Sequence, residues 1–130
     1  MKSLVLLGLL SLGTLASNLS VANEISPDFL KKEITSAQTE YLSGSSDSGL
    51  YALQALARLL ESDKSTSLHC ELGPNNLSFT YLRIGLLHER AGNDSKAKAN
   101  FQKALNTYKG EHIQLAQLKD NVLQLDEMHN

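Results

Sequence analysis

Apolar residues recur at intervals of three and four along most of the chain, and this spacing constrains the fold more than any other sequence feature. Leu30, Ile34, Ala37 and Tyr41, for example, follow one another at four, three and four. No stretch between turn-forming residues alternates apolar and polar side chains over the length of a strand. A helix turns every 3.6 residues, whereas a strand repeats every two, so the spacing predicts an all-helical protein. A composition of 42% hydrophobic and 20% charged residues fits a single globular domain.

The first 22 residues have the features of a secretory signal peptide. Lys2 precedes an apolar run over residues 4–16, and no acidic side chain occurs before Glu24. Ser20-Val21-Ala22 forms a small-x-small cleavage site, with Thr14-Leu15-Ala16 as a second candidate. The apolar run is shorter than the ~20 residues of a membrane-crossing helix, so we expect no membrane span. The sequence therefore predicts a signal peptide at 1–22 and one mature domain at 23–130, in the periplasm or secreted.

The net charge and the single cysteine exclude some classes of partner and any internal disulfide. The net charge of −2 gives no general attraction to nucleic acid or to anionic lipid, so neither is expected to bind. Cys70 is the single cysteine and cannot form an internal disulfide. In an oxidising compartment such a thiol is either buried or paired between chains, and both remain open. A short signal without internal disulfides is typical of a bacterial periplasmic or secreted protein.

Capping and turn residues define the first two of five predicted helices. The first begins at Ser26-Pro27-Asp28, which supplies a capping hydroxyl, a proline at the first helical position and an acid in the first turn. It ends before the glycine- and serine-rich segment 44–49. The second covers residues 50–60 and is apolar almost all round, which predicts a central, buried position.

A long polar connection at 62–76 leads to three more predicted helices. The third and fourth cover about 77–91 and 94–108, and Gly110 is expected to close the fourth in the left-handed conformation that favours glycine. The last helix carries one narrow apolar stripe, formed by Leu115, Leu118, Val122 and Leu125. Such a stripe suits either the cap of a helical stack or pairing with another helix, which includes a homo-oligomer.

Two short helical patterns meet at Gly92. Gly85 and Ala97 are small where two antiparallel helices would approach closely, and Phe101 would fill the space between their turns. The set around the turn is Tyr81, Ile84-Gly85, His88, Gly92, Ala97, Phe101 and Ala104. In kind and spacing it resembles the tetratricopeptide repeat (TPR), over about residues 78–111. Two positions depart from that pattern: His88 replaces the usual tyrosine, and Lys109 stands where a proline is common.

The resemblance implies an all-α fold, a short right-handed stack of antiparallel helix pairs with about five helices and a C-terminal capping helix. Because one repeat cannot bury its own apolar faces, the first two predicted helices are expected to form a second, degenerate pair. Spacing alone places Ala52, Leu56 and Leu59 at its Ala, Phe and Ala positions. A generic helical bundle is the alternative.

In TPR proteins, ligands lie along the concave surface formed by the first helix of each repeat. The matching positions here, which we call the groove face, are Phe79, Leu82, Leu86, Glu89 and Arg90. They are mostly apolar, so the resemblance implies binding of an apolar peptide or helix rather than a carboxylate clamp, which uses lysine and asparagine. The alternative is that Leu82 and Leu86 pack against the second or the last predicted helix.

The sequence contains no pattern that supports catalysis, a cofactor or a metal site. His69-Cys70-Glu71 is the only cluster of reactive side chains, and adjacent side chains diverge instead of forming a nucleophile and base pair. No second Cys/His set at metal spacing completes a site, and His88-Glu89-Arg90 lacks the second histidine of a zinc protease helix. We expect no enzymatic activity.

The sequence predicts an exported protein–protein interaction module that binds a peptide or helix of another envelope protein. The alternative is an immunity-type inhibitor that neutralises a periplasm-acting toxin or hydrolase. In that case Glu61, Asp63 and Glu71, which flank the long connection, would enter a basic cleft. An enzyme built on His69 and Cys70 would require an exposed, rapidly alkylated thiol.

Overall fold

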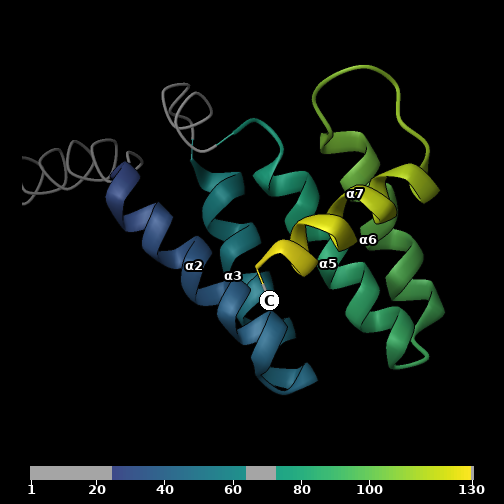
Figure 1. Cartoon of the computed structure of the whole chain (residues 1–130), viewed down its shortest axis with the longest axis horizontal. Coiled ribbons are helices and arrows are strands. Elements are labelled where there is room, and N and C mark those ends of the chain that lie inside the picture. The colour runs from purple at the N-terminus through teal and green to yellow at the C-terminus, as the bar shows by residue number, and fades with distance from the viewer. Residues whose placement is uncertain (1–24, 64–72, 130) are drawn as a thin grey trace, which may run out of the picture.

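The protein is a stack of helix pairs, described by a computed structural model over residues 25–63 and 73–129. These residues form five helices and no strand: α2 (Pro27–Ser43), α3 (Ser46–Ser62), α5 (Asn76–Arg90), α6 (Asp94–Thr107) and α7 (Leu115–Met128). Helix α2 pairs with α3, α5 pairs with α6, and α3 packs against α5 (Figure 1). The predicted all-helical stack of antiparallel pairs with a C-terminal helix is therefore confirmed.

Helix α2 begins as the sequence predicts, but α3 begins earlier. The Ser26 hydroxyl accepts the Phe29 N–H at 3.2 Å and caps α2. Helix α3 starts at Ser46, not at Leu50, because Ser45 is its cap and accepts the Ser48 N–H at 3.1 Å. Gly49 therefore lies inside α3, where an added Cβ would be 3.2 Å from the Cα of Tyr41 on α2. Gly49 does not break the helix; it lets the two backbones approach.

The α5–α6 turn is built as predicted around Gly92. This glycine has φ +80°, its N–H donates to the Glu89 carbonyl at 3.1 Å, and the Asn93 N–H donates to the His88 carbonyl at 2.8 Å. These two bonds form a Schellman motif, which satisfies carbonyls that the end of α5 would otherwise leave unpaired. The two helices then meet closely, since a Cβ on Gly85 would lie 2.5 Å from the Phe101 ring.

The end of α6 differs from the prediction. The helix ends at Thr107, Tyr108 is its extended C-cap, and Gly110 lies beyond it with φ +140°, so the closing role expected of Gly110 is wrong. The turn is held instead by Asn75, whose Oδ1 accepts the Lys109 N–H at 2.7 Å and whose Nδ2 donates to the Lys109 carbonyl at 3.2 Å. Proline has no N–H and could not make the first bond, which explains why lysine suits a position where proline is common.

The two helix pairs share one positional frame when residues are counted from Gly44 and from Gly92. Residues at the same offset are buried in both pairs, and they are Leu30 and Ser78, Ala37 and Gly85, Gly49 and Ala97, Leu53 and Phe101, and Leu56 and Ala104. This frame corrects the expected one by three residues. Ala52 and Leu59, which the sequence placed at the two alanine positions, are only partly buried.

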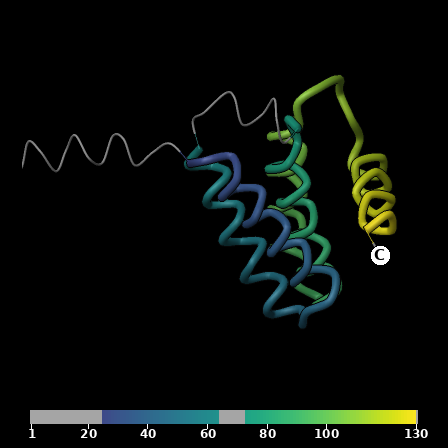
Figure 2. The backbone as a smooth tube through the Cα atoms, turned by 60° about the vertical axis from the view of Figure 1, so that its left-hand side comes forward, coloured from purple at the N-terminus to yellow at the C-terminus, as the bar shows by residue number. Residues whose placement is uncertain are grey.

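Helix α5, and not α3, is the most enclosed element. It packs against α3, α6 and α7, and the Ser78 hydroxyl in its first turn donates to the Ala104 carbonyl of α6 at 2.7 Å. The expected central position of the second predicted helix holds only in part, because α3 leaves Tyr51 72% exposed. Figure 2 shows α7 to one side of the other four helices.

Candidate functional site

The groove face does not lie open in this structure. Leu82 and Leu86 are 0% and 6% exposed and belong to the hydrophobic core, and Phe79 is partly buried against it. Glu89 and Arg90 are exposed at the C-terminal end of α5. The structure therefore favours the alternative in which both leucines pack inside the protein.

Helix α7 covers this face. Its stripe residues Leu118 and Val122 are fully buried and join the same core as Leu82 and Leu86. Two ion pairs fix its course: Arg83 Nη2 lies 2.8 Å from Asp126 Oδ1, and Lys119 Nζ lies 3.2 Å from Glu89 Oε2. Asp126, the later of the two α7 residues, pairs with Arg83, the earlier of the two α5 residues. The C-terminal part of α7 therefore reaches the middle of α5 (Figure 1).

The Arg83–Asp126 pair also reaches α2. Both nitrogens Nε and Nη2 of Arg83 donate to Asp126 Oδ1, at 3.0 and 2.8 Å, and the guanidinium carbon lies 5.9 Å from the centroid of the Tyr41 ring. Burial raises the pKa of Tyr41, and the nearby negative charge of Asp126 raises it further. The end of α7 therefore lies close to the first helix of each pair, where the TPR resemblance implies a ligand.

The other ion pair is more exposed and is joined to α6. The Lys119 ammonium lies 4.4 Å from the centroid of the Phe101 ring, while the carboxylate of Glu89 is about half exposed. An exposed pair of this kind stabilises a protein by about 1 kcal/mol or less. Burial of Leu118 and Val122 contributes more to holding α7, and the two ion pairs set its register.

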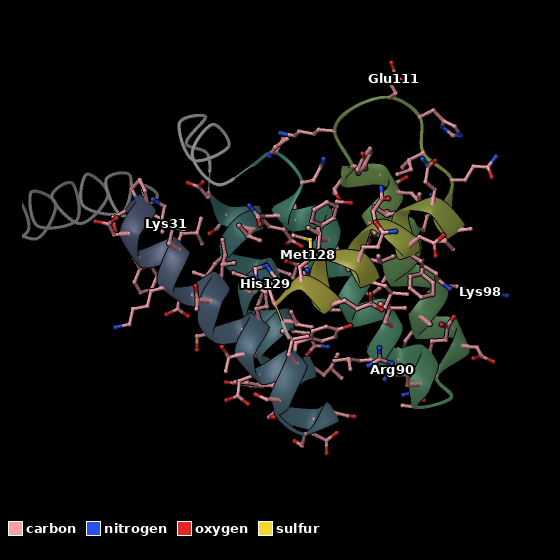
Figure 3. All side chains as sticks on the ribbon, viewed as in Figure 1. Lys31, Arg90, Lys98, Glu111, Met128 and His129 are labelled. Carbon is pink, nitrogen blue, oxygen red and sulfur yellow. The ribbon has the colours of Figure 1, made fainter. Side chains whose placement is uncertain are left out.

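The remaining sequence candidates form no chemical site within residues 25–63 and 73–129. His69, Cys70 and Glu71 lie outside the described residues, and His112 and His129 are exposed. Figure 3 shows His129 beside Met128 at the end of α7. Among residues 25–63 and 73–129, no group of three or more His, Cys, Asp or Glu side chains could hold a metal ion. No helix within these ranges is long and apolar enough to cross a membrane.

Sequence reasoning missed the Arg83–Asp126 pair, although a signal for it exists. Asp126 continues the spacing of Leu118 and Val122 by another four residues, so it lies on the apolar stripe of α7. A charged residue at such a position is almost never buried unless it is paired. The expected partner is therefore a cation on whichever surface the stripe covers.

In comparisons with protein-family models, with curated proteins and with solved structures, nothing matches this chain.

Proposed function

We propose that the protein is an exported interaction module that binds an amphipathic helix of another envelope protein on the groove face. The observation that carries the proposal is the packing of α7, an amphipathic helix, on this same face. Helix-in-groove recognition uses an apolar stripe at intervals of three and four, and α7 has such a stripe. The protein's own helix is thus a template for the ligand.

The template specifies the chemistry of the partner helix. Its stripe should present aliphatic side chains, as Leu118 and Val122 do. An acid should stand near the end of the stripe to meet Arg83, and a base about two turns earlier should meet Glu89. Such charges contribute more to orientation and register than to affinity, because buried ion pairs lose much of their attraction to desolvation.

The partner must compete with α7. Helix α7 follows α6 through a short connection at residues 108–114, and a short tether keeps a segment at an effective concentration on the order of millimolar. The apparent affinity for a partner equals the affinity of the uncovered groove face multiplied by the fraction of molecules in which α7 has left that face. A change that weakens α7 should therefore strengthen partner binding, which an ordinary binding site would not show.

The test is site-specific photo-crosslinking of the full chain in its native host's envelope. A photoreactive amino acid replaces exposed Arg90, at the edge of the groove face, or exposed Lys98 on α6, the matched control; Figure 3 shows both side chains. Each is studied with and without Asp126→Ala, which removes the ion pair to Arg83. We expect a defined adduct from position 90 but not from position 98, and a severalfold higher yield with Asp126→Ala.

Equal yields at both positions, or a lower yield with Asp126→Ala, would refute helix binding on the groove face. An adduct with a toxin or hydrolase would make the protein an inhibitor instead of an adaptor. An adduct with a second copy of the chain would point to homo-oligomerisation through α7. Export is tested in the same cells, where N-terminal sequencing of the envelope form should find the chain starting at about residue 23.

A further inference from the structure

A concave site lies on the opposite side of α5 from α7. Tyr81, Ile84 and His88 form its floor, and α3 and α6 provide its two walls. On the helical wheel of α5 these floor residues point about 160° away from the groove face. No α2 or α7 residue lines the cavity, which we call the α3–α6 cleft. A ligand in this cleft is independent of the proposed function, because that function uses the other face.

Basic side chains outnumber acidic ones in the cleft, although the net charge of the protein is negative. Arg58 on α3 and Lys96 and Lys103 on α6 line it, and Glu61 on α3 is its single acidic residue. The chain as a whole carries a net charge of −2. Lys103 is held over the floor, with its ammonium 5.4 Å from the centroid of the Tyr81 ring. A cleft lined mainly by charges of one sign raises the local concentration of ligands of the opposite sign.

His88 gives the cleft a hydrogen-bonding group that the fold does not use. Its side chain is 6% exposed, and Nδ1 is buried with no hydrogen-bond partner among the described residues. A buried N–H without a partner is costlier than a buried lone pair, which favours the neutral ring with its proton on Nε2. Burial, followed by the positive charge of Lys96, lowers the pKa of His88 and also favours the neutral ring. His88 can then donate from Nε2 to a ligand.

The size and lining of the cleft fit a small organic molecule. Its volume is about 520 Å³, within the range of small-molecule sites. Tyr81, Ile84 and Ala57 supply an apolar surface for a carbon skeleton, and Gln54 and Asn100 add amide groups to the lining. Inorganic phosphate would leave the apolar floor uncovered. Glu61 disfavours a second negative charge beside it.

We propose that the α3–α6 cleft binds a small organic acid, with its carbon skeleton on the apolar floor and one carboxylate held by Lys96, Lys103 and His88. Arg58 at the opposite wall adds long-range attraction for the anion. The ligand is recognised by the combination of one carboxylate and an apolar body, and neither part alone is sufficient.

The experiment is a titration of the full chain followed by backbone NMR, with benzoate as the probe. Benzamide has the same shape without the charge, and inorganic phosphate has the charge without the apolar body. We expect saturable shifts in α3, α5 and α6 around the cleft, with a Kd of about 1 mM, as suits a ligand of this size. Benzamide and phosphate should each bind at least about tenfold more weakly.

Variants test the assigned residues. Lys96→Gln and Lys103→Gln should each weaken benzoate roughly threefold to tenfold, whereas Lys98→Gln, an exposed lysine outside the cleft, should leave the Kd unchanged. In the wild-type protein, benzoate should shift the Nε2 resonance of His88 and raise the pKa of its ring. The proposal is overturned if benzamide or phosphate binds as tightly as benzoate, if Lys98→Gln has the same effect as Lys96→Gln, or if no saturable shift occurs.

Discussion

Replacing Gly85 by alanine measures how closely α5 and α6 approach. The new Cβ would lie 2.5 Å from Phe101 Cε1 and 2.6 Å from Cδ1, so the ring would have to move by about 0.9 Å to reach an ordinary 3.4 Å contact. Phe101 is 4% exposed and packed in the core, and it has little space into which to move. Inserting a methyl group into such a site costs about 1–3 kcal/mol.

Helix propensity acts in the opposite direction. Alanine is favoured over glycine inside a helix by about 1 kcal/mol, because it loses less backbone entropy on folding. The expected net effect of Gly85→Ala is therefore a loss of up to about 2 kcal/mol, or a fall in Tm of up to roughly 15 °C for a domain of this size. Urea unfolding followed by circular dichroism gives the free energy, and thermal melting gives the Tm.

A double-mutant cycle separates the two effects. Phe101→Leu shortens the ring that the new methyl group would meet, so in that background Gly85→Ala should be neutral or stabilising, by up to about 1 kcal/mol. The comparison with Gly85→Ala alone isolates the steric contact. If Gly85→Ala stabilises the wild-type protein by itself, the close approach of α5 and α6 at this point is wrong, and with it the packing that the TPR resemblance implies.

Three further predictions each concern a single side chain. Ser78→Ala removes the 2.7 Å bond to a buried carbonyl and should lower the unfolding free energy by about 1 kcal/mol in urea titrations; no change would mean that the bond does not form. Asp126→Asn leaves the Arg83 side chain, only 12% exposed, without a counter-charge. It should cost about 2 kcal/mol, and absorbance titration should show Tyr41 ionising at lower pH than in the wild type; an unchanged titration would contradict their proximity. Because the pKa of folded His88 is lowered, its contribution to stability is present above its ordinary pKa of about 6.5 and is lost as pH falls below that value. His88→Gln should flatten this part of the stability–pH curve, and an equally steep curve would assign the effect to other groups.

Features fixed by neighbouring residues could be predicted from the sequence. Ser26 caps α2 and Gly92 closes α5 as expected, because both roles depend on hydrogen bonds within one turn. The start of α3 was misplaced because Gly49, which by propensity weakens a helix, is tolerated there for its tertiary contact with Tyr41. Propensity carries no information about such a contact.

The sequence predicted the apolar stripe of α7 but left the position of this helix open between alternatives. The spacing of Leu118 and Val122 shows that this side of the helix must be covered, but several apolar faces are available to cover it. The choice is fixed by the pairing of Arg83 with Asp126, 43 residues away in the sequence. The sequence left open whether Leu82 and Leu86 face a ligand or pack against the second or the last predicted helix, and in the structure both are buried in the same core as Leu118 and Val122 of α7.

The paired hydrogen bonds between Asn75 and Lys109 have a consequence for how a protein like this can grow. They connect the residue before α5 to a residue just after α6. These two residues are 34 positions apart, which is the length of one tetratricopeptide repeat. A segment whose two ends meet can be copied in tandem without altering the path of the chain before or after it. Gene duplication of this segment would add a helical hairpin whose two ends are already hydrogen-bonded to each other. Because the lysine keeps its backbone N–H, each copy would retain both hydrogen bonds to the asparagine.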